Sequence, residues 1–446
     1  ESAMLFQANL REKIYLDPLH GLISFDINTP QERILVALLD SPEFQRLRRI
    51  RQLGMAHMAF QGAEHSRFTH SIGVFALARR VLEQLSKLYA IDPAIAFVGE
   101  IAALLHDIGH GPFSHIIEKF LGRSHENWGS QILLDPTTRI GQLLRAVDTQ
   151  LPVHLAELYH GNFTPRYIVH IVSSQLDADR FDYLLRDSLM TGVKHGIFDL
   201  DRLIHMLRID ESGTRLVVAD RGVAPVEKYL QSRYHMYRQV YLHKTVVAAE
   251  YMLLGLLWRA SGLAREGKLP SVAKTHRLHR ILTQPEQMTV ADFLYLDDPL
   301  VLYFLKEWSE ERDPTLADLS RRLLTRDLFK TFDLPSDPNT QRQRLEEAGE
   351  FLRANGLDPE FYLLVAKSGD QPYKPYDSGT VKSDSSIHVE QTGPHGTSYV
   401  EIDRLSPTIR AFTESGYSVV RAVFPARANG RDLRGKMEEI LSGSPR

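Results

Sequence analysis

The stretch from residue 100 to 114, EIAALLHDIGHGPFS, constrains the fold and chemistry of this chain more than any other. Its apolar run at residues 101–105 predicts a buried helix, expected over residues 94–108, that delivers the adjacent pair His106 and Asp107. Burying unpaired charge is strongly unfavourable, and a bound metal ion is one way to compensate it. The stretch therefore predicts a metal site.

A glycine- and proline-rich segment follows the pair and predicts the end of the helix (Gly109, Gly111 and Pro112). His110 comes four residues after His106, so we expect both side chains on one helix face. The chain has no cysteine, so any metal would be held by His, Asp, Glu or water. Mn, Mg, Fe, Co, Ni and Zn all suit such ligands, and the choice stays open.

Two further ligands must come from elsewhere in the chain. His70 falls in the first turn of a helix expected from Ser66 to Leu88, three residues after Arg67. Asp179 lies in a second dense polar segment, residues 174–190. We expect His70 and Asp179 to complete the site with His106 and Asp107.

The second polar segment also suggests two side-chain groupings on a helix. Asp182 and Arg186, four residues apart, suit a surface ion pair. Arg180, Tyr183 and Asp187 have the spacing of one helix face, which would offer a cation, a phenol and a carboxylate together. Such a face is too polar for a simple core helix.

The pattern along the chain predicts a mainly α-helical protein. We expect a helical core over residues 1–330, with a turn at residues 17–21, a hairpin at 206–220 and one long helix at 224–262. Strand patterns after residue 360, interrupted by a polar loop at 368–386, predict a small C-terminal α+β subdomain over residues 331–446.

The charge balance and hydropathy limit the partners. The net charge of −3 argues against a globally basic nucleic-acid binder, so nucleic acid is a disfavoured partner. The arginine-rich stretch at residues 46–51 is either a solvated face or an anion site. No run of about 18 apolar residues and no signal-peptide pattern stands out, so we expect no membrane span and a cytoplasmic location.

Four motifs together closely resemble the HD-domain phosphohydrolases. They are RFTHS at residues 67–71, HDIGHGPFSH at 106–115, HE at 125–126 and DADRFDYLLRD at 177–187. Within that family the chain is most similar to the deoxynucleoside triphosphate triphosphohydrolases, including the vertebrate enzyme with a sterile-alpha-motif domain. The similarity runs from about residue 13 to 244 and continues more weakly to about 424.

The resemblance implies a role for each matching residue. The metal ligands would be His70, His106, Asp107 and Asp179. His110, His115 and His125 would line the reacting phosphate, with Glu126 orienting a histidine. Arg67, Arg180 and Arg233 would bind phosphates. Gln52, Leu53, Tyr183, Asp187 and Tyr241 would surround the sugar or the base. Relatives often carry Lys at the position of Arg180, which keeps the charge but changes the geometry of its donors.

The resemblance also implies the reaction and its regulation. A deoxynucleoside triphosphate would be split into a deoxynucleoside and tripolyphosphate, with His115 or His110 as the acid that protonates the leaving oxygen. An activating guanine nucleotide would bind at Asp40, Gln45 and Arg48, and a second activating nucleotide at Lys244, between the subunits of a dimer or tetramer.

Two other functions remain open from the sequence. The site could hydrolyse another nucleotide, such as a monophosphate, a cyclic nucleotide or an alarmone. Alternatively, the chain could sense nucleotides or bind single-stranded nucleic acid with a vestigial site, although the presence of all four expected ligands argues against a dead site.

Overall fold

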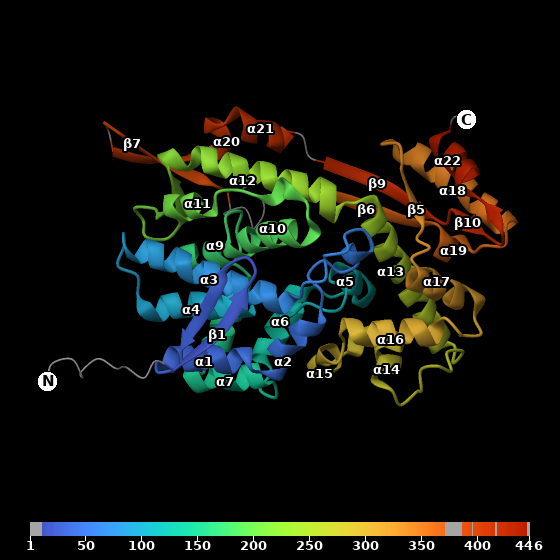
Figure 1. Ribbon diagram of the computed structural model, residues 1–446, viewed down its shortest axis with the longest axis horizontal. Helices are drawn as coiled ribbons and strands as arrows, with labels where there is room; N and C mark the ends of the chain where they lie inside the picture. Colours follow the sequence, from blue (N-terminus) through green and yellow to red (C-terminus); the bar gives the residue numbers. More distant parts are fainter. Residues whose placement is uncertain (1–10, 371–385, 395, 415–416, 444–446) are drawn as a thin grey trace.

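The computed structural model describes residues 11–370, 386–394, 396–414 and 417–443. As the sequence predicts, helices dominate (Figure 1). The functional part of the molecule is built on three helices that pack side by side: α3 (Arg67–Ser86), α4 (Pro93–Leu105) and α10 (Ala178–Thr191). Their buried faces belong to one continuous hydrophobic core.

The central helix ends earlier than the sequence suggests. Asp92 caps α4, Pro93 occupies its first turn, and the helix stops at Leu105 rather than at residue 108. His110 then lies in the turn beyond, so the expectation that His106 and His110 share one helix face is wrong. The cause is close packing at Gly109, where a Cβ would collide with the carbonyl of His125 and the amide nitrogen of Gly129.

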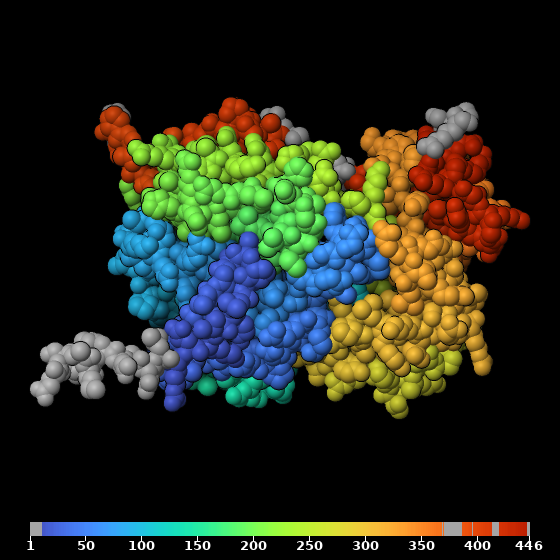
Figure 2. All heavy atoms as spheres, viewed as in Figure 1, coloured from blue at the N-terminus to red at the C-terminus, as the bar shows by residue number. Residues whose placement is uncertain are grey.

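An N-terminal hairpin precedes the core. Strands β1 (Glu12–Asp17) and β2 (Gly21–Asp26) pair antiparallel across the predicted turn at residues 17–21. The hairpin lies on the molecular surface, where it is blue in Figure 2. Two short helices follow, α1 (Pro30–Leu39) and α2 (Pro42–Arg46), and Thr29 and Ser41 cap them with their hydroxyl groups.

The arginine-rich stretch at residues 46–51 is only partly buried, since Arg48 and Arg49 are exposed. Arg46 is buried and donates to the carbonyls of Leu296 and His110, at 2.9 and 3.0 Å. The other three arginines each contact a neighbouring side chain: Arg48 stacks on Phe68, Arg49 pairs with Asp297 and Arg51 pairs with Glu64. The stretch therefore joins the core to the segment around residue 297 through Arg46 and Arg49, while Arg48 and Arg49 stay accessible to solvent.

Further helices complete the core and its cover. They are α5 (His115–Leu121), α6 (His125–Leu134), α7 (Arg139–Val147), α8 (Leu151–Tyr159), α9 (Arg166–Val172) and α11 (Leu200–Met206). The predicted hairpin at 206–220 is present as β3 (Leu207–Ile209) and β4 (Leu216–Ala219).

The long helix expected at 224–262 is two helices. Helix α12 (Val223–Met236) passes into a π-helical turn at Tyr237–Tyr241, and α13 (Lys244–Arg265) begins after a break at His243. A π-helical turn redirects side chains and is often found at functional sites. Helix α13 is long and apolar enough to cross a membrane, but 78% of its apolar window is buried inside the protein, as in a core helix.

The C-terminal part consists of short helices and strands. The helices are α14 (Arg277–Thr283), α15 (Val290–Leu294), α16 (Asp298–Trp308), α17 (Pro314–Thr325), α18 (Pro338–Ala354), α19 (Pro359–Tyr362), α20 (Ile402–Leu405), α21 (Pro407–Glu414) and α22 (Arg434–Ser442). The strands are β5 (Lys330–Asp333), β6 (Leu364–Asp370), β7 (His388–Gly393), β8 (Gly396–Glu401), β9 (Tyr417–Phe424), β10 (Arg427–Ala428) and β11 (Arg431–Asp432).

The C-terminal strands divide between two places, which Figure 1 shows at opposite ends of the upper edge. One sheet has the order β5-β9-β6, whereas β7 and β8 extend the core hairpin into a sheet of order β3-β4-β7-β8. The division into domains at residue 330 stays a prediction. Most of the polar loop expected at 368–386 lies outside the described residues, and residues 368–370 belong to β6.

The close contact at Gly109 gives a stability prediction. We expect Gly109→Ala to lower the free energy of unfolding by about 1–3 kcal/mol, because the added methyl must push α6 away from the end of α4. Denaturant unfolding measures the change. Gly262→Ala in α13, where a Cβ meets nothing within 4 Å, is the control and should be neutral or slightly stabilising. Equal stability of the two variants would contradict the packing argument.

Candidate metal centre and substrate cavity

The four expected metal ligands meet at one point, although His70 lies 36 residues before His106 and Asp179 lies about seventy residues after Asp107. His70 comes from α3, His106 and Asp107 from the end of α4, and Asp179 from α10. The His106 Nε2 atom lies 3.2 Å from His70 Nε2, 3.3 Å from Asp107 Oδ1 and 3.7 Å from Asp179 Oδ1. The His70 Nε2 atom lies 3.1 Å from Asp179 Oδ1.

The hydrogen bonds of His106 and His70 show which ring nitrogen of each residue faces the other metal ligands. The Nδ1 atom of His106 lies 2.9 Å from the Ala103 carbonyl, which can only accept, so this nitrogen carries the proton. The Nδ1 atom of His70 likewise donates to Asp182 Oδ2, at 2.7 Å. The two Nε2 atoms therefore face each other and two carboxylates, and after losing any proton each could offer its lone pair to a divalent cation.

The electrostatics at this point favour positive charge. Burial alone would lower the pKa of His70, but its hydrogen bonds to Asp179 and Asp182 raise it to about 10. Burial would likewise raise the pKa of Asp179, yet the hydrogen bonds to His106 and His70 hold it well below its usual range. The residues present thus fit a divalent ion of the kind bound by nitrogen and oxygen donors.

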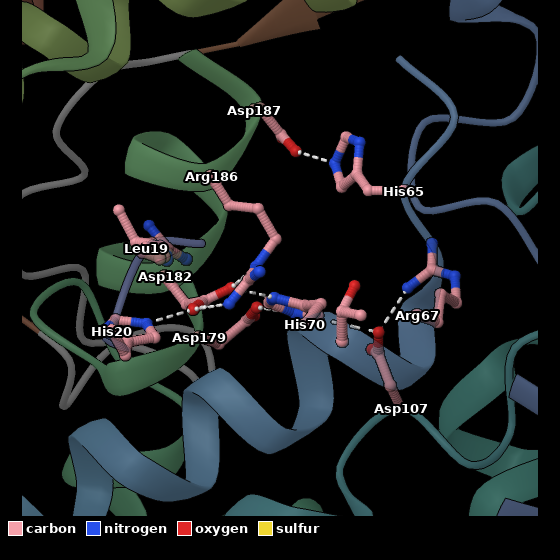
Figure 3. Close-up of polar contacts among 12 residues, drawn as sticks. Leu19, His20, His65, Arg67, His70, Asp107, Asp179, Asp182, Arg186 and Asp187 are labelled. Atoms are coloured by element: carbon pink, nitrogen blue, oxygen red, sulfur yellow. Dashed lines mark hydrogen bonds and ion pairs between the residues drawn. The ribbon is translucent and has the colours of Figure 1, made fainter. Parts of the chain in front are cut away.

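Asp182 stabilises the metal centre through its contact with His70 (Figure 3). Its carboxylate accepts from His70 and from His20, the latter at 2.6 Å, and from the Nε and Nη2 atoms of Arg186, at 2.8 and 2.9 Å. Arg186 continues to Asp17 at 2.8 Å. Asp182 is 0% and Arg186 1% exposed, so the prediction of a surface ion pair is wrong. Burial makes this pair a structural support for a metal ligand.

A cavity of about 510 Å³ opens beside the metal centre. Its walls come from the loop at residues 52–56, from α5, from α10, from the π-helical turn and from α13. All the expected catalytic residues line it (His110, His115, His125 and Glu126), as do His106, Asp107 and Asp179. His70 lies behind its neighbours and is fully buried.

Three histidines gather around one carboxylate that the sequence analysis missed. The His110 and His125 rings stack with their centroids 3.9 Å apart. Glu118 Oε1 lies 2.9 Å from His125 Nδ1, 3.4 Å from His115 Nδ1 and 3.6 Å from His110 Nδ1. Glu126 Oε1 is 3.9 Å from His125 Nε2, so Glu118 is the closer partner of this ring. Its position three residues after His115 in a helix was the available signal.

The charge within the stacked pair is unequal. Burial and the nearby Arg67 guanidinium hold the pKa of His110 well below its ordinary value. Burial would also lower the pKa of His125, but the hydrogen bond to Glu118 raises it. Two imidazolium rings in contact would repel each other, so a proton shared within this pair is favoured on His125 over His110.

The three expected phosphate-binding arginines lie in different settings. Arg67 is buried and donates to Asp107 Oδ2 at 2.5 Å and to Ser114 Oγ at 2.7 Å. Ser114 and its neighbour Phe113 have φ values of 52° and 54°, a strained conformation that aims the hydroxyl at Arg67. Arg180 lines the cavity. Arg233 is buried against the Tyr237 ring and is not among the lining residues, so its phosphate role stays a prediction.

The residues expected around the sugar all line the cavity: Gln52, Leu53, Tyr183, Asp187 and Tyr241. Asp187 is the centre of this group, because it accepts from Tyr241 at 2.8 Å and contacts His65 Nε2 at 2.7 Å. The Tyr183 and Tyr241 rings meet edge to face. Tyr183 is half-buried and borders the cavity, unlike an ordinary core tyrosine.

The expected activator residues lie outside the cavity. Asp40 pairs with Lys13 at 2.6 Å, Gln45 donates to the Leu39 carbonyl and accepts from Arg48, and Lys244 lies 3.4 Å from Asp333. The structure therefore does not bring these four residues to the candidate active site, and activation by a nucleotide stays a prediction.

Comparisons with known proteins agree with this geometry. Residues 67–187 match the HD domain and residues 198–260 match the HD associated region. The uncharacterized protein YwfO of Bacillus subtilis is 38% identical over 379 residues, which cover 85% of this chain and 84% of YwfO. The solved structure of a phosphohydrolase from Bacteroides thetaiotaomicron is similar with a TM-score of 0.76 and 30% identity, covering 93% of this chain and all of the other.

A named enzyme is more distantly similar. The deoxynucleoside triphosphate triphosphohydrolase SAMHD1 of Gallus gallus is 29% identical over 359 residues, which cover 72% of this chain and 56% of that protein.

The buried support of His70 gives a metal-binding prediction. We expect Asp182→Asn to weaken metal affinity by about 10- to 100-fold, because the ring loses the carboxylate that fixes its orientation and tautomer. Titration with Mn²⁺ or Zn²⁺, followed by calorimetry, measures the change. Asp201→Asn, a surface carboxylate paired with Arg80, is the control. Unchanged affinity in a folded Asp182→Asn protein would contradict the supporting role.

Proposed function

We propose that this chain, which belongs to the HD-domain phosphohydrolase family, hydrolyses deoxynucleoside triphosphates to a deoxynucleoside and tripolyphosphate. Membership of the family rests on the HD match, on YwfO and on the phosphohydrolase structure. The choice of substrate is our own inference. The observation that carries it is a single cavity with a metal centre and two arginines at one end and a tyrosine–aspartate group beside them.

The metal end of the cavity suits a chain of phosphates. His70, His106, Asp107 and Asp179 would hold the ion, which when bound supplies a Lewis acid and lowers the pKa of water. Arg67 and Arg180 add two permanent positive charges on the same cavity. Guanidinium groups bind phosphate oxygens through paired hydrogen bonds, so a polyphosphate is the anion that this end would select.

The histidine group supplies proton transfer. The departing 5′ oxygen needs a proton, since an alkoxide is a poor leaving group. His125, whose pKa is raised by its hydrogen bond to Glu118, and His115, the exposed ring beside the same carboxylate, are both suited to donate it. His110 is kept neutral by burial and by Arg67, so its role is better described as accepting a hydrogen bond.

The sugar would lie against the aromatic wall of the cavity. Asp187, with its position fixed by His65 and Tyr241, is placed to accept a hydrogen bond from the 3′ hydroxyl. Tyr183 would pack against C2′, where a deoxyribose carries only hydrogen. The chicken enzyme that acts on deoxynucleoside triphosphates is a distant relative and adds support for this class of substrate.

Product analysis tests the proposal. We expect the protein with Mn²⁺ or Mg²⁺ to release tripolyphosphate and a deoxynucleoside from dGTP, dATP, dCTP or dTTP, with no mono- or diphosphate product. Asp179→Asn should reduce the rate to background, because one metal ligand is lost. The panel also contains deoxynucleoside monophosphates, cyclic nucleotides and guanosine tetraphosphate. Hydrolysis of one of these instead would overturn the choice of substrate but not the family.

The position of Tyr183 predicts sugar selectivity. We expect Tyr183→Ala to relax the preference for deoxynucleotides over ribonucleotides by roughly 10- to 100-fold, because space opens for a 2′ hydroxyl. The ratio of kcat/KM for dGTP and GTP measures it, with Tyr303→Ala, an exposed residue on α16, as the control. If Tyr183→Ala hydrolyses ribonucleotides no better than the parent, this residue does not select the sugar.

A further inference from the structure

One wall of the cavity, formed by α5 and α13, carries side chains of a different kind from those around the metal centre. They are Ile116, Val246 and Val247 together with Glu250, Lys119 and Tyr251. This wall combines apolar surface with one carboxyl and one ammonium group. None of these residues has a part in the metal, phosphate or sugar binding described above.

Glu250 faces into the cavity from α13. It lies three and four residues after Val247 and Val246, which share its helix face and also line the cavity. Within the described part of the chain, no hydrogen bond or ion pair reaches its carboxyl group. Burial raises its pKa to about 7, against the opposing influence of His115 and Lys119. A half-buried carboxyl group without a protein partner is able to accept hydrogen bonds from a ligand that enters the cavity.

Lys119 supplies the complementary donor. Its Nζ atom lies 3.0 Å from the Tyr251 hydroxyl and 4.6 Å from the centre of the Tyr251 ring, so its position on the cavity wall is held from α13. Lys119 lies one turn after His115 on α5, and both influence the charge of Glu250. The two helices therefore present an acceptor and a donor to the same space.

The charge of this wall indicates which part of a nucleotide lies against it. A carboxylate repels polyphosphate, and the two arginines and the metal ligands belong to α3, to α10 and to the end of α4 rather than to the wall formed by α5 and α13. The remaining polar part of a deoxynucleotide is its base. Carboxylates accept from base amino groups, and lysine donates to the O6 atom of guanine. Guanine places two N–H donors, N1 and N2, beside that oxygen, whereas the single imide N–H of thymine lies between two carbonyls.

We propose that Glu250 and Lys119 read the base of the substrate and make the site selective for guanine. The inference rests on the proposed function, since it takes the ligand to be a deoxynucleotide. Glu250 would accept from N1–H and from the 2-amino group, and Lys119 would donate to O6. Adenine and cytosine, each with one amino group, bind less well, and thymine binds least.

Binding and turnover of matched nucleotides test the assignment. Affinities of the α,β-imido analogues of dGTP, dITP and dTTP are measured by calorimetry with Mn²⁺, for the parent and for Glu250→Gln. The parent should bind the guanine analogue best, with the 2-amino group contributing the difference from hypoxanthine. Glu250→Gln, which keeps the size of the side chain, should reduce the guanine-to-thymine ratio by about tenfold or more.

The controls separate this inference from the proposed function. Glu266→Gln, at the exposed end of the same helix, should leave the ratio unchanged, and equal melting temperatures show that each variant folds. An unchanged ratio in Glu250→Gln overturns the base-reading role. A parent that prefers the guanine analogue but hydrolyses no deoxynucleoside triphosphate overturns the reaction and keeps the base-reading role. A parent that binds no analogue overturns both.

Discussion

The structure depends on placing four electron-pair donors around one buried point. Two imidazole nitrogens 3.2 Å apart, with two carboxylates beside them, would repel one another without a positive charge between them. The chain meets this cost with a second layer of buried charge. Asp182 fixes His70, Arg186 neutralises Asp182, and Asp17 joins Arg186 from the N-terminal hairpin. Each buried charge thus has a partner, and the innermost group is left suited to a cation.

This network explains why separate segments are needed for one site. Gly73 on α3 provides the space for the Asp182–Arg186 pair, since a Cβ there would collide with both side chains. On the other side, the C-terminal sheet holds the wall of the cavity, because Arg421 of β9 donates to the Leu242 carbonyl just after the π-helical turn. The metal ligands and the substrate wall are therefore positioned by elements from both ends of the chain.

Much of the fold and of the candidate site could be predicted from the sequence, and each incorrect or missing prediction has a physical cause. The four ligands followed from motif spacing and resemblance, because the side chains that hold a metal are of few types. The burial of Asp182 and Arg186 could not be predicted from the sequence, since i, i+4 spacing is equally typical of a surface ion pair. Glu118 was missed because only packing brings α5 against α6. The glycine- and proline-rich segment at residues 109–112 predicted that the helix ends, but not that α4 stops as early as Leu105, where Gly109 packs against α6.

The same physics organises the cavity along its length. Because like charges repel strongly in a site of low polarity, a cavity with two guanidinium groups on one wall and a carboxyl group beside an ammonium group on another would favour one orientation of an elongated, asymmetric ligand. In the proposed orientation, the phosphates would lie toward Arg67 and Arg180 and the base toward Glu250 and Lys119. The histidines around Glu118 line the same cavity, and in the proposed orientation they would lie near the bond that joins phosphate to sugar. Orientation of the substrate and placement of the proton donors thus follow from one distribution of charge.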